Sequence, residues 1–104
     1  MIVKVPRKIT VGAYDITIAY VSKLCCDYKL LGQAITDRQL IKLEPDTSGQ
    51  TNAVTLFHEI THAINDSYSC ELDEHNIDRI AHGIVSILVK DFGIELDWSD
   101  IRGV

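Results

Sequence analysis

Residues 58–62 read His-Glu-Ile-Thr-His, with two imidazoles four positions apart and a glutamate directly after the first. Side chains four residues apart on a helix lie one turn above each other, so both histidines could bind one metal ion. Glu59 lies about 100° around the helix from His58, beside such an ion and not on it. There its carboxylate could take a proton from a water bound to the metal. The spacing therefore predicts a zinc site with His58 and His62 as ligands and Glu59 as the base.

A catalytic zinc needs three protein ligands and one open position, so the sequence must supply a third ligand. Acidic residues and histidines after the motif are the candidates: Asp66, Glu71, Asp73, Glu74, His75, Asp78 and His82.

Helix geometry separates these candidates. On a helix over about residues 73–90, Glu74 and Asp78 share a stripe with the apolar positions, whereas His75 and His82 turn toward the flank. A carboxylate on a core-facing stripe is costly unless it is paired or binds a metal. We therefore expect Glu74 to be the third ligand and Asp78 to accept an N–H from His58 or His62. The alternative is that Glu74 is simply an acid that favours a helix N-terminus.

The elements that must position these residues are two helices in the second half of the chain. Apolar residues recur every three or four positions, which predicts a helix over Thr51–Asp66. Its polar side carries Thr55, His58, Glu59, His62 and Asn65. A polar loop over residues 67–71 precedes the second helix, whose expected buried residues are Ile77, Ile80, Ala81, Ile84 and Leu88.

The first half of the chain has the alternating pattern of β-strands. One predicted hairpin joins residues 9–11 and 16–20 around Gly12, and a second joins Leu31–Ile35 to Leu40–Leu43. Strands followed by helices indicate an α+β fold. We expect N-terminal antiparallel hairpins of three to four strands, packed on the two C-terminal helices, with the tail around Trp98 packing back on the domain.

Length and composition limit the remaining possibilities. At 104 residues, with 46% hydrophobic and 24% charged residues, residues 1–104 should form one globular domain. The formal net charge of −5 gives no basic patch for nucleic acid or an anionic membrane. No signal peptide or membrane span is evident, so we expect a cytoplasmic location. The cysteines, Cys25, Cys26 and Cys70, lack the spacing of a disulfide framework or a zinc motif.

Residues 55–64 and 74–81 together resemble the zincin-like metallopeptidases, in particular the small single-domain forms common in phages and prophages. The second stretch looks like the glutamate-bearing helix of the ImmA/IrrE-type peptidase group. The resemblance implies that His58, His62 and Glu74 hold Zn²⁺, that Glu59 is the catalytic base and that the substrate is a protein or peptide. It also implies a zincin-like sheet beside the active-site helix and, for a phage protein, the host cytoplasm. The chain departs from the larger members in its short length and in having no evident Met-turn.

The leading hypothesis is zinc-dependent peptide hydrolysis, with an edge strand over Leu31–Ile35 or Leu40–Leu43 binding the substrate by strand addition. Three residues are candidates to stabilise the oxyanion: Tyr68, His75 and His82. An alternative is a non-catalytic interaction module stabilised by zinc, in which Cys70 could close the ligand set. A third possibility is that the histidines are surface residues that bind no metal.

Overall fold

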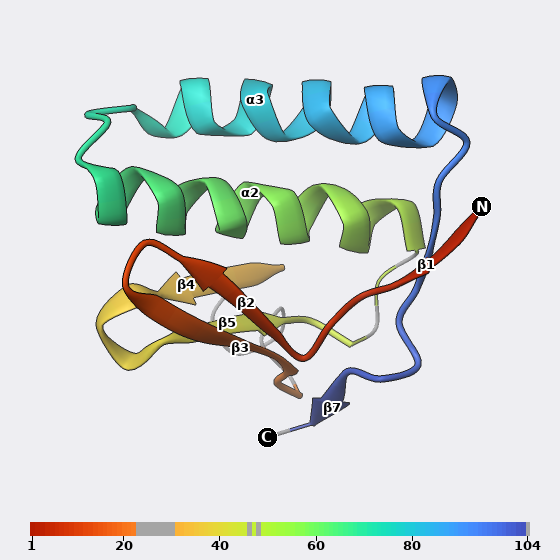
Figure 1. Ribbon diagram of the computed structural model, residues 1–104, viewed down its shortest axis with the longest axis horizontal. Helices are drawn as coiled ribbons and strands as arrows, with labels where there is room; N and C mark the ends of the chain where they lie inside the picture. The colour runs from red at the N-terminus through yellow and green to blue at the C-terminus, as the bar shows by residue number, and fades with distance from the viewer. Residues whose placement is uncertain (23–30, 46, 48, 104) are drawn as a thin grey trace.

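The computed structural model describes residues 1–22, 31–45, 47 and 49–103. It is an α+β fold, as predicted, in which a β-sheet, helix α2 (Gly49–Tyr68) and helix α3 (Glu74–Ser86) form three successive layers (Figure 1). The expected absence of a disulfide at Cys25 and Cys26 concerns positions outside the described residues.

Both predicted hairpins are present in the sheet. Strands β2 (Lys8–Val11) and β3 (Tyr14–Tyr20) form the first hairpin. Strands β4 (Gly32–Ile35) and β5 (Leu40–Leu43) form the second, joined by the short 3-10 turn η1 (Thr36–Arg38).

Each hairpin is antiparallel, as predicted, but the sheet as a whole is mixed because the two hairpins join through a parallel pair that was not predicted. Strand β3 pairs with β5 in parallel, so the order is β2-β3-β5-β4. Alternation within a strand specifies which face is buried, but it does not specify the partner strand or its direction. The order leaves β4 with one edge that is not paired with any described strand.

Three short strands were not predicted. Strands β1 (Ile2–Lys4) and β6 (Glu95–Asp97) form a separate parallel pair that joins the N-terminal segment to the chain after α3. Strand β7 (Arg102–Gly103) pairs with the end of β3. Each contains only two or three residues, too few for a periodic pattern, and each forms only because a remote segment lies alongside.

Helix α2 is the central layer and packs on the sheet. Its buried residues Leu56 and Ala63 belong to the same core as the sheet residues Ile16, Ile41 and Leu43. Trp98 and Ile101 also pack against this core, so the tail returns to the domain as expected.

The C-terminal end of α2 is joined to both hairpin turns. The Thr36 hydroxyl donates to Asp66 at 2.9 Å, and the Gly12 N–H donates to the Tyr68 hydroxyl at 3.1 Å. These bonds fix the helix along its axis relative to both hairpins.

Helix α3 lies on α2 as the outer layer and continues into a π-helical turn, η2 (Ile87–Asp91). Its buried residues are Ile77, Ala81 and Val85. The prediction that Ile80 and Ile84 are buried is wrong, since they are 39% and 38% exposed, and Leu88 is half-buried. A helix that packs mainly on one other helix buries a narrow stripe, and residues beside that stripe stay in contact with solvent.

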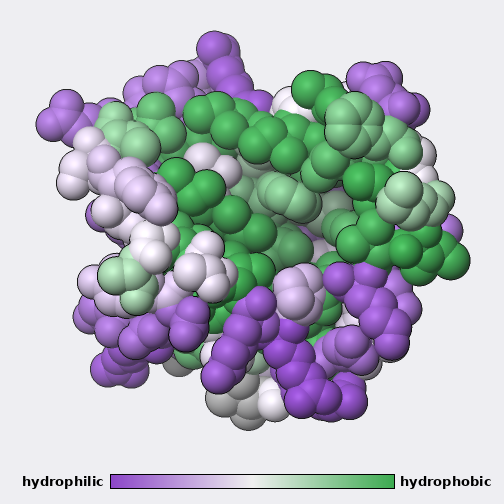
Figure 2. Space-filling view, viewed as in Figure 1, coloured by the Kyte–Doolittle hydropathy of each residue, from purple (hydrophilic) through white to green (hydrophobic). Residues whose placement is uncertain are grey.

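Figure 2 shows an extensive apolar surface over the two helices on the face turned toward the viewer. The exposed apolar side chains of these helices and of the turn that follows include Ile64, Ile80, Ile84 and Ile87. Among the described residues, no helix combines the length and apolar character needed to cross a bilayer.

Candidate metal centre

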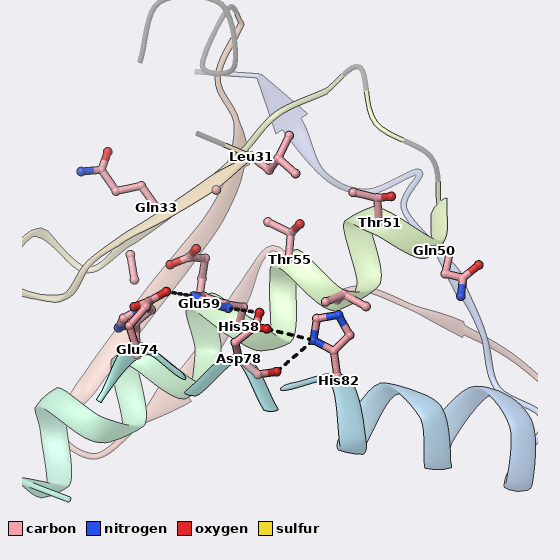
Figure 3. A pocket seen from close by; sticks show the side chains of 14 residues that line it. Leu31, Gln33, Gln50, Thr51, Thr55, His58, Glu59, Glu74, Asp78 and His82 are labelled. Atoms are coloured by element: carbon pink, nitrogen blue, oxygen red, sulfur yellow. Dashed lines mark hydrogen bonds and ion pairs between the residues drawn. The ribbon is translucent and has the colours of Figure 1, made fainter. Parts of the chain in front are cut away.

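A cleft of about 820 Å³ opens where α2, β4 and α3 meet. Helix α2 forms its floor, β4 one wall and α3 the other (Figure 3). The cleft is lined by Leu31, Gly32, Gln33, Ala34, Gln50, Thr51, Val54, Thr55, His58, Glu59, His62, Glu74, Asp78 and His82. His58, Glu59 and His62 of the His-Glu-Ile-Thr-His motif therefore all face this cleft.

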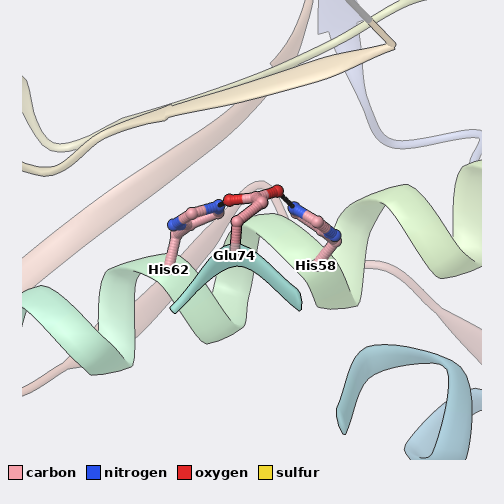
Figure 4. Close-up of side chains that lie close together, drawn as sticks. All are labelled: His58, His62 and Glu74. Carbon is pink, nitrogen blue, oxygen red and sulfur yellow. Dashed lines mark hydrogen bonds and ion pairs between the residues drawn. The ribbon is translucent and has the colours of Figure 1, made fainter. Parts of the chain in front are cut away.

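The structure brings His58, His62 and Glu74 together (Figure 4). The Glu74 carboxylate lies between the imidazoles, with Oε1 2.6 Å from His58 Nε2 and Oε2 2.8 Å from His62 Nε2. One potential ligand atom from each residue lies within 4.8 Å of the other two. Among the described residues, this is the one group of three or more histidine, cysteine or acidic side chains with such spacing.

The loop between the helices holds Glu74 in this position. The Asn65 side chain accepts the Leu72 N–H at 2.9 Å, which fastens the loop to the last turns of α2. Asp73 then caps α3, because its carboxylate accepts the Asn76 N–H at 2.8 Å. Glu74 is thus placed in a well-defined first helical turn, facing α2.

The donor set fits a zinc ion. Two imidazole nitrogens and a carboxylate oxygen are the ligands of many catalytic zinc sites, and bonds of about 2.0–2.2 Å in a tetrahedron separate donors by roughly 3.3 Å. Glu74 lies nearer to both nitrogens than that, so its carboxylate would need to withdraw by about half an ångström. Its side chain is 67% exposed and can make this small movement at little cost.

Asp78 lies behind His58, with Oδ1 3.2 Å from His58 Nδ1. A carboxylate in this position accepts the Nδ1–H and leaves Nε2 free to face a metal. Glu74 and Asp78 face α2, as predicted. The prediction that they lie on a buried stripe is wrong. They are 67% and 51% exposed, because they lie where the α2–α3 contact opens into the cleft.

Glu59 is the acid that is buried, with 7% of its surface exposed. Burial raises the pKa of its carboxyl group, against the opposing influence of His58 and His62 and of an N–H bond from Ala34 of β4. The Ala34 N–H holds the carboxylate against the edge strand. Glu59 is therefore positioned by the sheet as well as by its own helix.

Gly32 and Ala34 were not among the predicted site residues. A Cβ at Gly32 would lie 2.6 Å from Thr55 Cγ2 and 3.2 Å from Glu59 Cγ, so only glycine lets β4 approach α2 this closely. A glycine inside a strand pattern is a known sign of close backbone approach, and that sign was available in the sequence.

The other candidates lie elsewhere. Tyr68 accepts the Gly12 N–H and does not line the cleft, and neither does the exposed His75. Asp66 is bound by Thr36, and Cys70 is exposed and is not a member of the three-residue cluster. His82 lines the cleft on the α3 side.

Comparison of the chain with models of known protein families, with curated proteins and with solved structures finds no match.

Proposed function

We propose that this chain is a zincin-like metallopeptidase that uses zinc to hydrolyse peptide bonds. The observation that carries the proposal is the convergence of His58 Nε2, His62 Nε2 and the Glu74 carboxylate at one side of a cleft, with the buried Glu59 beside them. The three-residue donor set opens on a cleft of about 820 Å³, which favours a reacting site over a closed, purely structural one.

Zinc at such a site would polarise the scissile carbonyl and lower the pKa of water toward about 7. His58 and His62 would hold the ion through Nε2, and Asp78 would keep the proton of His58 on Nδ1. Glu59 would take a proton from the attacking water and give it to the leaving amine nitrogen. Because its pKa is raised by burial, its carboxylate holds a proton more readily than an exposed glutamate does.

The edge of β4 that is not paired with any described strand offers a place for an extended peptide. The Leu31 carbonyl accepts the Glu44 N–H, so Gln33 and Ile35 also direct their main-chain groups toward β5. Gly32 and Ala34, between them, direct theirs toward the cleft. The Ala34 N–H is bonded to Glu59, so a peptide would pair with the main-chain groups of Gly32 and with the Ala34 carbonyl. A peptide added to this edge would lie directly above Glu59 and the metal ligands.

The test is hydrolysis of β-casein by the protein loaded with one equivalent of zinc. Glu59→Gln should retain one zinc per chain and lose about 100- to 10,000-fold in kcat, because the amide cannot move the proton. Glu95→Gln, at an exposed position of β6, is the matched control and should hydrolyse casein at the wild-type rate. Equal hydrolysis by Glu59→Gln and wild type, or no hydrolysis by zinc-loaded wild type, would contradict the proposal.

A further inference from the structure

Among the described residues, six titratable side chains line the cleft, and the metal centre uses five of them. The sixth is His82, which lies on α3 one helical turn beyond Asp78 and is 59% exposed. Figure 3 shows its ring standing on the wall formed by α3, across the cleft from β4. His82 is thus a polar group at the cleft without a part in holding the metal or moving the proton.

The hydrogen bonds of His82 fix which of its nitrogens carries the proton. Nδ1 lies 2.9 Å from the main-chain oxygen of Asp78, and a carbonyl oxygen can only accept, so Nδ1 is the donor. The Asp78 carboxylate, with Oδ2 3.6 Å from the same nitrogen, favours the same assignment. In the neutral ring Nε2 therefore carries a lone pair, and Figure 3 shows this side of the ring turned away from Asp78 toward the cleft.

A peptide bound to the edge of β4 has a second edge that faces the opposite wall. Along an extended chain, N–H and C=O groups point alternately to the two sides. The groups that do not pair with Gly32 and Ala34 must therefore point toward α3, where they lose contact with water unless a partner is present.

Resting on the proposed peptidase function, we propose that His82 Nε2 accepts a main-chain N–H of the substrate on the edge turned away from β4. The peptide is then held between two walls, by β4 on one side and by His82 on the other. The same proton assignment argues against His82 as the group that stabilises the oxyanion, because a neutral ring with its proton on Nδ1 has no N–H to donate from Nε2.

The first test measures KM and kcat for β-casein with zinc-loaded variants. His82→Phe keeps an aromatic ring but loses the acceptor, and it should raise KM about 10-fold with kcat changed by less than about 3-fold. His82→Gln retains an acceptor and should recover part of the loss. His75→Phe is the matched control, since His75 is exposed on the same helix and does not line the cleft, and its KM should be that of the wild type.

A second measurement identifies the bond directly. Synthetic peptides spanning the fastest-cleaved casein bond, each with one N–H replaced by N–CH3, are compared as substrates of wild type and His82→Phe. Methylation of the N–H that His82 accepts should raise KM for wild type and leave KM of His82→Phe unchanged. Methylation of an N–H that pairs with β4 should raise KM equally for both proteins.

The outcomes separate the two proposals. If wild type hydrolyses casein and His82→Phe has the same KM, the role of His82 is overturned and the peptidase proposal stays intact. The same conclusion follows if methylation affects both proteins alike at every position. Absence of hydrolysis by wild type would overturn the peptidase proposal and, with it, the role of His82.

Discussion

The two helices that supply the metal centre differ in how firmly the rest of the molecule holds them. Helix α2 lies between the sheet and α3, and His58 on it is only 17% exposed. Helix α3 packs mainly on α2, buries three residues, and presents Glu74, Asp78 and His82 with more than half of each side chain exposed. The histidines and the base are therefore set by a packed core, and the third ligand by a less firmly held outer helix.

This difference indicates what a bound metal would do besides chemistry. An ion held by His58, His62 and Glu74 joins the outer layer to the central layer across the loop over residues 69–73. A ligand that binds only the folded chain stabilises it in proportion to the logarithm of its concentration. We expect α3 to gain more from the metal than α2 does.

The largest effect should come from removing a ligand of the central helix. His62→Ala leaves one histidine ligand, so zinc affinity should fall by well more than about 100-fold. Loss of a residue that only hydrogen-bonds to a metal ligand already lowers the affinity by up to roughly 100-fold. Competition titration with a fluorescent zinc chelator measures it, with His75→Ala as the control. Affinity within about 3-fold of wild type would show that the outer helix, and not α2, dominates binding.

The next effect concerns the contact between the helices. Ile77 is buried against α2, and Ile77→Ala should lower the free energy of unfolding of the metal-free protein by about 2–5 kcal/mol. Ile80→Ala, the same change on the same helix at a 39% exposed position, should cost less than about 1 kcal/mol. Urea denaturation followed by circular dichroism compares them, and equal costs would mean that α3 has no preferred buried face.

A smaller effect is expected at Asp78. Asp78→Asn keeps the shape but weakens the hold on His58 Nδ1, and zinc affinity should fall about 10- to 100-fold. Asp91→Asn, exposed in η2, should leave the affinity unchanged. If both variants bind zinc as the wild type does, the orientation of His58 is set by α2 packing alone.

The smallest effect is a pH dependence of the metal-free protein. The pKa of Glu59 is raised in the folded state, so between the unfolded and folded pKa values the folded chain binds more protons than the unfolded chain. Its contribution to stability is therefore present at low pH and is lost as pH rises through the folded pKa. Urea titrations from pH 4 to pH 7 should show a smaller fall in stability for Glu59→Gln than for wild type. A parallel fall in both would contradict burial as the cause of the shift.

Local pattern was enough to predict both hairpins and both helices, because each depends on spacing within one segment. The proximity of Glu74 to the histidines could be predicted because both lie on helices joined by a short loop and Glu74 shares a stripe with the apolar residues of its helix. The parallel pairing of β3 with β5 and the strands β1, β6 and β7 depend on remote partners, which no local pattern specifies. Ile80 and Ile84 were misplaced because a helical apolar stripe does not reveal how wide the neighbouring layer is. Gly32 could have been noticed as a glycine within a strand pattern, but the pattern does not identify Thr55 and Glu59 as the residues that need the space.

The capping bond from Asn76 to Asp73 has a consequence for how quickly the metal would exchange. Glu74 belongs to the first turn of α3, and the first turn of a helix opens far more often than the whole chain unfolds. Release of the third ligand would then need only the loss of that cap and one turn of helix. The metal would stay bound to the two histidines while the Glu74 carboxylate repeatedly dissociates and rebinds. A change at Asp73 would then alter the dissociation rate of the metal without changing its ligands.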